Sequence, residues 1–186
     1  MFGKLLVIML VGFCSALSAV TASAQNNPYK ISDSLYPDFV RVQNIKRNPQ
    51  VLELADSLYH EAEKIGDRKA QCALLCTPVQ YAHNTKDTEM MDKAAQRCRE
   101  EALKYKFPQY YYFAWKTQIA LYVNLKKLPK AMTLLSQMEN DTRLYFNGYG
   151  KVECYMLYGN IYKLLQNEDE AIRYYEMALE LSKRQT

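Results

Sequence analysis

Apolar residues recur every three to four positions along most of the chain, and polar residues fill the positions between them. This period is that of an amphipathic helix, and Pro, Gly, Asn and Asp residues interrupt it at intervals. The strongest turn signal is Asn147-Gly148-Tyr149-Gly150, and Thr77-Pro78 is expected to kink or interrupt a helix. The pattern predicts about eight helices, in residues 32–45, 49–65, 67–84, 87–106, 108–126, 129–140 and, as a final pair, 152–185.

The final pair carries small and aromatic residues on the faces where its two helices would meet. Small side chains let backbones approach closely, and tyrosine rings fill the remaining space. The two sets are Tyr155, Tyr158, Gly159 and Tyr162 on the first helix and Ala171, Tyr175 and Ala178 on the second. The segment resembles a tetratricopeptide repeat, and it departs from that signature at Tyr158, Gln166 and Lys183, where Leu, Gly and Pro are usual.

One such pair cannot bury its own apolar face, so related units are expected to stack against it. The second-helix pattern recurs around Ala55, Ala95, Ala131 and Ala171. An alternative register of the second unit runs through Ala94 and Cys98. The resemblance implies an all-α fold, a right-handed superhelical solenoid of antiparallel helix pairs.

Short segments spread over residues 26–181 carry a second resemblance. They are Asn27-Pro28-Tyr29-Lys30-Ile31, Leu35-Tyr36, Ala55-Asp56, Leu58-Tyr59, Gly66-Asp67, Lys69-Ala70-Gln71-Cys72, Tyr110-Tyr111-Tyr112, and Asn147 with Tyr149-Gly150. They are similar to the exported repeat region of Bacteroidetes sensory regulators, where such repeats precede a membrane span and a cytoplasmic kinase or DNA-binding module. This sequence departs from that group by stopping at Thr186 without either. The resemblance still implies an alternative function, as the sensory input domain of a membrane-associated signalling regulator or a shortened relative of one.

Residues 1–24 have the features of a secretory signal peptide. Lys4 precedes an apolar run over residues 5–13, and Ala22-Ser23-Ala24 is a small-residue cleavage site. The run is shorter than the ~20 residues of a membrane-spanning helix. We therefore expect one exported, periplasmic repeat domain, 25–186, that does not span the membrane. The alternatives are an anchor formed by an uncleaved signal segment or by a lipid at Cys14.

Charge and candidate chemistry point away from nucleic acid and from catalysis. The formal net charge is +4, and basic residues are interspersed with acidic ones, as on solvated helix faces. Neither His60 nor His83 has a Cys, Asp or Glu partner at metal-ligand spacing, and no phosphate loop, nucleophile elbow or zincin motif is present. The sequence predicts a non-enzymatic protein without metal or cofactor.

Four cysteines follow the signal segment: Cys72, Cys76, Cys98 and Cys154. A bridge between Cys72 and Cys76 is geometrically poor, because their Cβ vectors run nearly parallel on one helix. If a bridge forms, Cys98 on the next helix is the favoured partner, and the alternative is that all four pack as small apolar residues.

The run Tyr110-Tyr111-Tyr112-Phe113 places four aromatic residues in a row. Consecutive helical residues are 100° apart, so these rings cannot all face one core. At least one is expected to reach a surface or a groove.

The repeat resemblance implies a protein or peptide ligand in a concave groove lined by the first helix of each pair. The corresponding positions are Gln80, Asn84, Phe113, Lys116, Glu153, Met156, Asn160 and Lys163, with Ala120 beside them. Lys116 and Asn160 resemble two residues of a peptide-carboxylate clamp, a minority alternative. The helix that ends the chain is a second candidate surface, for self-association.

Overall fold

The computed structural model describes residues 27–185; the predicted signal peptide and Cys14 lie outside the described residues. Over that range the chain is all-α, as predicted, and contains no strand. The helices are α2 (Tyr36–Asn44), α3 (Gln50–Ile65), α4 (Arg68–Thr85), α5 (Thr88–Lys104), α6 (Pro108–Asn124), α7 (Leu128–Leu144), the short 3-10 helix η1 (Phe146–Gly148), α8 (Lys151–Leu164) and α9 (Glu168–Gln185).

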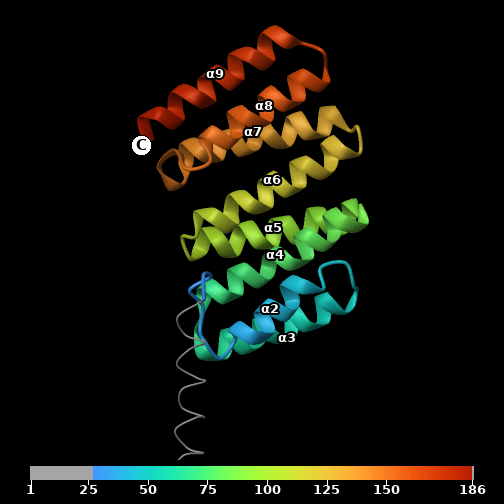
Figure 1. Ribbon diagram of the computed structural model, residues 1–186, viewed down its shortest axis with the longest axis vertical. Helices are drawn as coiled ribbons and strands as arrows, with labels where there is room; N and C mark the ends of the chain where they lie inside the picture. Colours follow the sequence, from blue (N-terminus) through green and yellow to red (C-terminus); the bar gives the residue numbers. More distant parts are fainter. Residues whose placement is uncertain (1–26, 186) are drawn as a thin grey trace, which may run out of the picture.

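The helices stack in chain order along the long axis of the molecule, from α2 and α3 at one end to α8 and α9 at the other (Figure 1). Each α-helix contacts the next one along the chain, which is compatible with antiparallel pairs. In addition, α4 contacts both α2 and α6. The helices α2, α4 and α6 therefore lie together on one side of the stack, where the candidate site is found.

Local signals set several helix ends. Asp67 caps α4 by accepting a hydrogen bond from the Ala70 amide at 2.9 Å, and Asp87 caps α5 by accepting one from the Met90 amide at 2.9 Å. Gly66 ends α3 in the left-handed region, at φ 75°, where glycine has no Cβ to clash.

Two predicted boundaries are wrong. The first helix begins at Tyr36 rather than near Ser32, because the preceding residues form turns and the Ser32 amide donates to Asp67 Oδ2 at 2.6 Å. Helix α7 runs past Asn140 to Leu144, since Thr142 continues its buried face.

Of the two expected outcomes at Pro78, a kink or an interruption, the interruption does not occur, because α4 continues through this residue. Proline has no amide hydrogen, so the carbonyl of Leu74 receives no helical hydrogen bond from it. Buried residues lie on both sides of the proline, including Thr77 before it and Val79 and Ala82 after it. Packing of both halves of α4 against neighbouring helices offsets the missing bond.

The four second-helix alanines, Ala55, Ala95, Ala131 and Ala171, are all buried, on α3, α5, α7 and α9 respectively. Alanine at these points lets adjacent helices approach closely. In the second unit both Ala95 and Cys98 are buried, whereas Ala94 is only partly so. The four alanines that recur in the sequence are therefore all core positions.

Asp67→Ala should lower the free energy of unfolding by about 0.5–2 kcal/mol at pH 7, because α4 loses its cap and the Ser32 contact. Burial alone would raise the pKa of Asp67, but hydrogen bonds from the Ala70 and Ser32 amides outweigh it and hold this pKa below its usual value. The carboxylate therefore stabilises the fold above the unfolded-state pKa of about 3.9 and loses this effect as the pH falls through the folded-state value.

Urea unfolding of both proteins from pH 7 to pH 3 measures this effect. The difference between wild type and variant should shrink below about pH 4. Asp87→Ala is the matched control, since it removes a cap that has no bond to the segment before α2. Equal losses at pH 7 for the two variants would contradict a stabilising role for the Ser32 contact.

Candidate binding cleft

The structure separates the predicted groove residues into groups. Gln80 and Phe113 line one cleft between α2, α4 and α6. Asn84 lies exposed one turn beyond Gln80, accepts a hydrogen bond from its side chain at 3.2 Å and donates to the Lys46 carbonyl at 3.5 Å. These residues therefore connect the C-terminal half of α4 to the end of α2.

The remaining predicted residues lie on α6 and α8. Lys116 forms an ion pair with Glu153 at 3.7 Å, which bridges the two helices. The Asn160 side chain accepts a hydrogen bond from the Tyr175 hydroxyl at 2.8 Å, so the two residues that resemble a carboxylate clamp have different partners. Met156 and Lys163 are exposed on α8.

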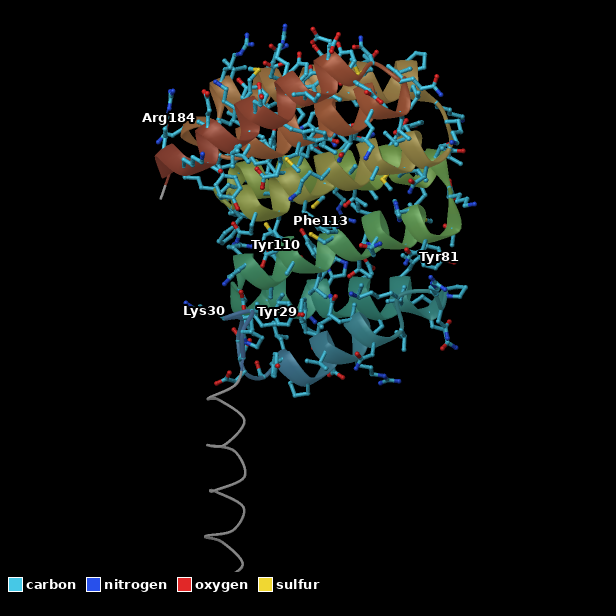
Figure 2. The ribbon with its side chains drawn as sticks, turned by 45° about the horizontal axis from the view of Figure 1, so that its top comes forward. Tyr29, Lys30, Tyr81, Tyr110, Phe113 and Arg184 are labelled. Atoms are coloured by element: carbon cyan, nitrogen blue, oxygen red, sulfur yellow. The ribbon has the colours of Figure 1, made fainter. Side chains whose placement is uncertain are left out.

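The cleft has a volume of about 250 Å³ and a mainly apolar wall. The segment before α2 contributes Tyr29, whose ring packs edge-on against Phe39 with 4.7 Å between ring centroids. Figure 2 shows Tyr110 and Phe113 between α4 and α6, with Tyr29 nearer the N-terminal end of the stack. The lining residues are Tyr29, Phe39, Val42, Gln43, Lys46, Ala73, Cys76, Thr77, Gln80, Gln109, Tyr110 and Phe113.

The aromatic run at the start of α6 divides as its helical spacing predicts. Tyr111 and Tyr112 are buried in the core between α6, α7 and α8. Tyr110 and Phe113, three residues apart, face the other way and line the cleft. The expectation that at least one of the four rings reaches a groove is confirmed.

Polar groups of the cleft are concentrated in a few side chains. Gln43, Gln80 and Gln109 supply amides, and Lys46 is the one charged residue among those that line the cleft. Thr77 is buried, and its hydroxyl has no hydrogen-bond partner. Ligand sites usually have such a wall, which is mainly apolar and carries a few polar groups that fix the orientation of the ligand.

The titratable side chains at the base of the cleft are neutral at physiological pH. Burial raises the pKa of Tyr110 to about 12, so its phenol stays protonated. The pKa of the Cys76 thiol also lies well above its usual value, because of its contact with Cys98 and because of burial. Both side chains are therefore uncharged at that pH.

Sequence reasoning missed the part of the cleft contributed by α2. The α2 residues that line the cleft lie three, four and seven positions apart, and so share one face of the helix: Phe39, Val42, Gln43 and Lys46. The groove positions predicted on the later helices have similar spacing. The same spacing, applied to the first helix, would have predicted these four residues. Tyr29 carries no such signal, because it precedes the helix.

His60 lies exposed on α3 beside two acidic side chains of the same helix. Its ring lies 3.3 Å from Glu63 and 3.8 Å from Asp56, one turn away on either side of an exposed face. His83 instead contacts the Asn124 amide at 3.2 Å. Among residues 27–185, no group of three or more His, Cys, Asp or Glu side chains is arranged to hold a metal ion.

No family model, no curated protein and no solved structure matches this chain. None of the helices in the described part of the chain is both long and apolar enough to cross a membrane. Its helices and its cleft define residues 27–185 as an all-helical stack with a mainly apolar cleft between α2, α4 and α6.

Proposed function

We propose that this chain is a non-enzymatic scaffold that binds a protein or peptide along the face formed by α2, α4, α6 and α8. The observation that carries the proposal is the cleft between the first three of these helices. Its Phe113 and Tyr110 side chains come from a run whose other two rings are fully used in the core. Partly exposed aromatic rings in a concave site are typical anchors of recognition surfaces.

The size of the cleft favours one side chain of a partner over a large cofactor. Drug-sized ligands occupy pockets of roughly 300–1,000 Å³, whereas an apolar cavity of about 150 Å³ already holds benzene. At about 250 Å³ this cleft has room for one substituted ring or one long aliphatic side chain. The amides at its rim can bond the backbone of an extended peptide that carries this anchor.

Charge favours a partner with an acidic residue beside the anchor. Lys46 is the one charged group among the lining residues, and no carboxylate lines the cleft. Further along the same face, Lys116 and Glu153 neutralise each other, and Asn160 and Lys163 remain exposed. The selectivity of the scaffold thus resides mainly at the end formed by α2 and α4.

The proposal also includes a fold family, a cellular location and a second mode of binding. The helix pairs form a tetratricopeptide-like solenoid, which the buried alanine at each second helix supports. The chain acts outside the cytoplasm after removal of residues 1–24. Self-association through α9 is a subsidiary mode, supported by Ile172 and Leu179, which are 55% and 54% exposed on its outer face.

Site-specific photocrosslinking in intact cells tests the proposed face. A photoreactive phenylalanine analogue at Gln80 or Met156 should give crosslinks to a partner, because both side chains lie on that face. Gln137, exposed on α7, is the matched control, since α7 contributes no residue to the cleft. We expect crosslinks from the first two positions that disappear when Phe113 is changed to Asp.

Three results would overturn the proposal. The first is crosslinking from Gln137 alone, and the second is equal crosslinking from all three positions. The third is crosslinking at Gln80 that survives Phe113→Asp in a variant with an unchanged circular dichroism spectrum. Crosslinks between two copies through α9, without any from Gln80, would assign binding to self-association.

A further inference from the structure

Three cysteines gather where α4, α5 and α6 meet, on the side of α4 that forms the wall of the cleft. The sulfurs of Cys76 and Cys98 are 3.8 Å apart, across the contact between α4 and α5. Cys72 lies one turn before Cys76. The Cys76 thiol donates a hydrogen bond to the backbone carbonyl of Cys72 at 3.5 Å. Cys154 belongs to a different core cluster, on α8.

We propose that Cys76 and Cys98 are an oxidation site, where a disulfide forms and ties α4 to α5 behind the cleft. The two sulfurs are already in contact and belong to different helices, so they can approach the bonding distance of about 2.0 Å by small side-chain rotations. Cys72 is not a competing partner for Cys76, because side chains one turn apart on the same helix point in parallel directions. In the exported compartment that the sequence predicts, such a bond would persist.

The two thiols have distinct roles because they differ in exposure. Cys76 is partly exposed and lines the cleft, whereas Cys98 is fully buried and donates to the Tyr110 carbonyl at 3.7 Å. A small disulfide compound that enters the cleft therefore meets Cys76 first. The buried Cys98 thiol then attacks the mixed disulfide that this reaction leaves on Cys76.

Two successive thiol–disulfide exchanges form the bond. The Cys76 thiol loses its proton, and its sulfur attacks one sulfur of the reagent, whose disulfide bond breaks and releases one thiol. The Cys98 thiol then loses its proton, and its sulfur attacks Cys76 in the mixed disulfide and releases the second thiol. Two protein thiols are oxidised, and one reagent disulfide is reduced to two thiols.

Oxidation changes the wall of the cleft directly. The new bond draws the Cys76 sulfur toward α5, away from Phe113 and the other lining side chains. Formation of the bond itself needs no partner protein, so this proposal stands or falls separately from the proposed function.

The test uses the purified full chain under native conditions with bis(2-hydroxyethyl) disulfide as the probe. After an acid quench and alkylation of remaining thiols, peptide mapping by mass spectrometry identifies each bond. We expect a Cys76–Cys98 crosslinked peptide in wild type, and also in Cys72→Ala and Cys154→Ala, the matched controls. In Cys98→Ala the mixed disulfide on Cys76 should accumulate about ten-fold over wild type, because no thiol resolves it.

Wild type alone can refute the proposal, whatever the variants do. A Cys72–Cys76 or Cys72–Cys98 peptide as the main product would overturn it. So would a mixed disulfide on Cys76 that persists unresolved. The proposal is also wrong if Cys72, Cys76, Cys98 and Cys154 all stay reduced in the folded chain at a probe excess that oxidises the urea-unfolded chain.

Discussion

Gly150→Ala should destabilise the protein by about 2–5 kcal/mol, although it adds a single methyl group. Gly150 precedes α8 at φ 85°, a left-handed conformation that costs a residue with a Cβ roughly 1–2 kcal/mol. A Cβ built there would lie 2.7 Å from the Tyr112 ring. That ring is 1% exposed and lies against Tyr111, Phe146 and Tyr149, so it has no space to move into. Overpacking of this kind costs a further ~1–3 kcal/mol.

Gly148→Ala separates the two contributions. Gly148 has nearly the same backbone conformation, at φ 81°, but a Cβ there would meet no atom within 4 Å. We expect this control to lose only the backbone cost of about 1–2 kcal/mol. Urea unfolding followed by circular dichroism measures both variants. Equal losses would show that the Tyr112 ring is not held in place as the structure has it.

The sequence predicted helices and their shared packing positions because those signals are local. Asp67 and Asp87 are caps next to the helices they begin, and the buried alanines of the second helices recur at similar spacing. Where local and tertiary effects competed, as at Pro78, the local signal did not interrupt the helix. There the packing of buried residues on both sides decided the outcome.

The cleft was only half predictable for the same reason. Gln80 and Phe113 each follow from the pattern along their own helix, but the cleft exists because α2, α4 and α6 come together and Tyr29 adds to its wall. The contact between Gly150 and Tyr112 likewise joins positions far apart in the chain. The sequence predicted a turn at Gly150, yet nothing local predicted which side chain would lie against this residue.

Trp115→Ala should cost about 3–5 kcal/mol, because it removes a large buried ring from the junction of α5, α6 and α7. Trp115 is 6% exposed, and the Arg99 guanidinium carbon lies 3.8 Å from the centre of the ring. Its indole nitrogen donates to Asp141 Oδ2 at 3.0 Å, and the Tyr111 hydroxyl donates to the same oxygen at 2.6 Å. The ring therefore joins a cation on one helix to an anion on another.

Trp115→Phe distinguishes loss of volume from loss of the hydrogen bond. It keeps an aromatic face for Arg99 but removes the donor to Asp141, which retains the Tyr111 hydroxyl; we expect a loss of about 1–3 kcal/mol. Because Trp115 is the single tryptophan of the chain, unfolding is followed by circular dichroism rather than fluorescence. A double-mutant cycle with Arg99→Ala should give a coupling of about 0.5–2 kcal/mol. A loss below about 1 kcal/mol for Trp115→Ala would be inconsistent with a buried ring. In that case α6 would not pack against α5 and α7 as described, and the cleft on its opposite face would lose its support.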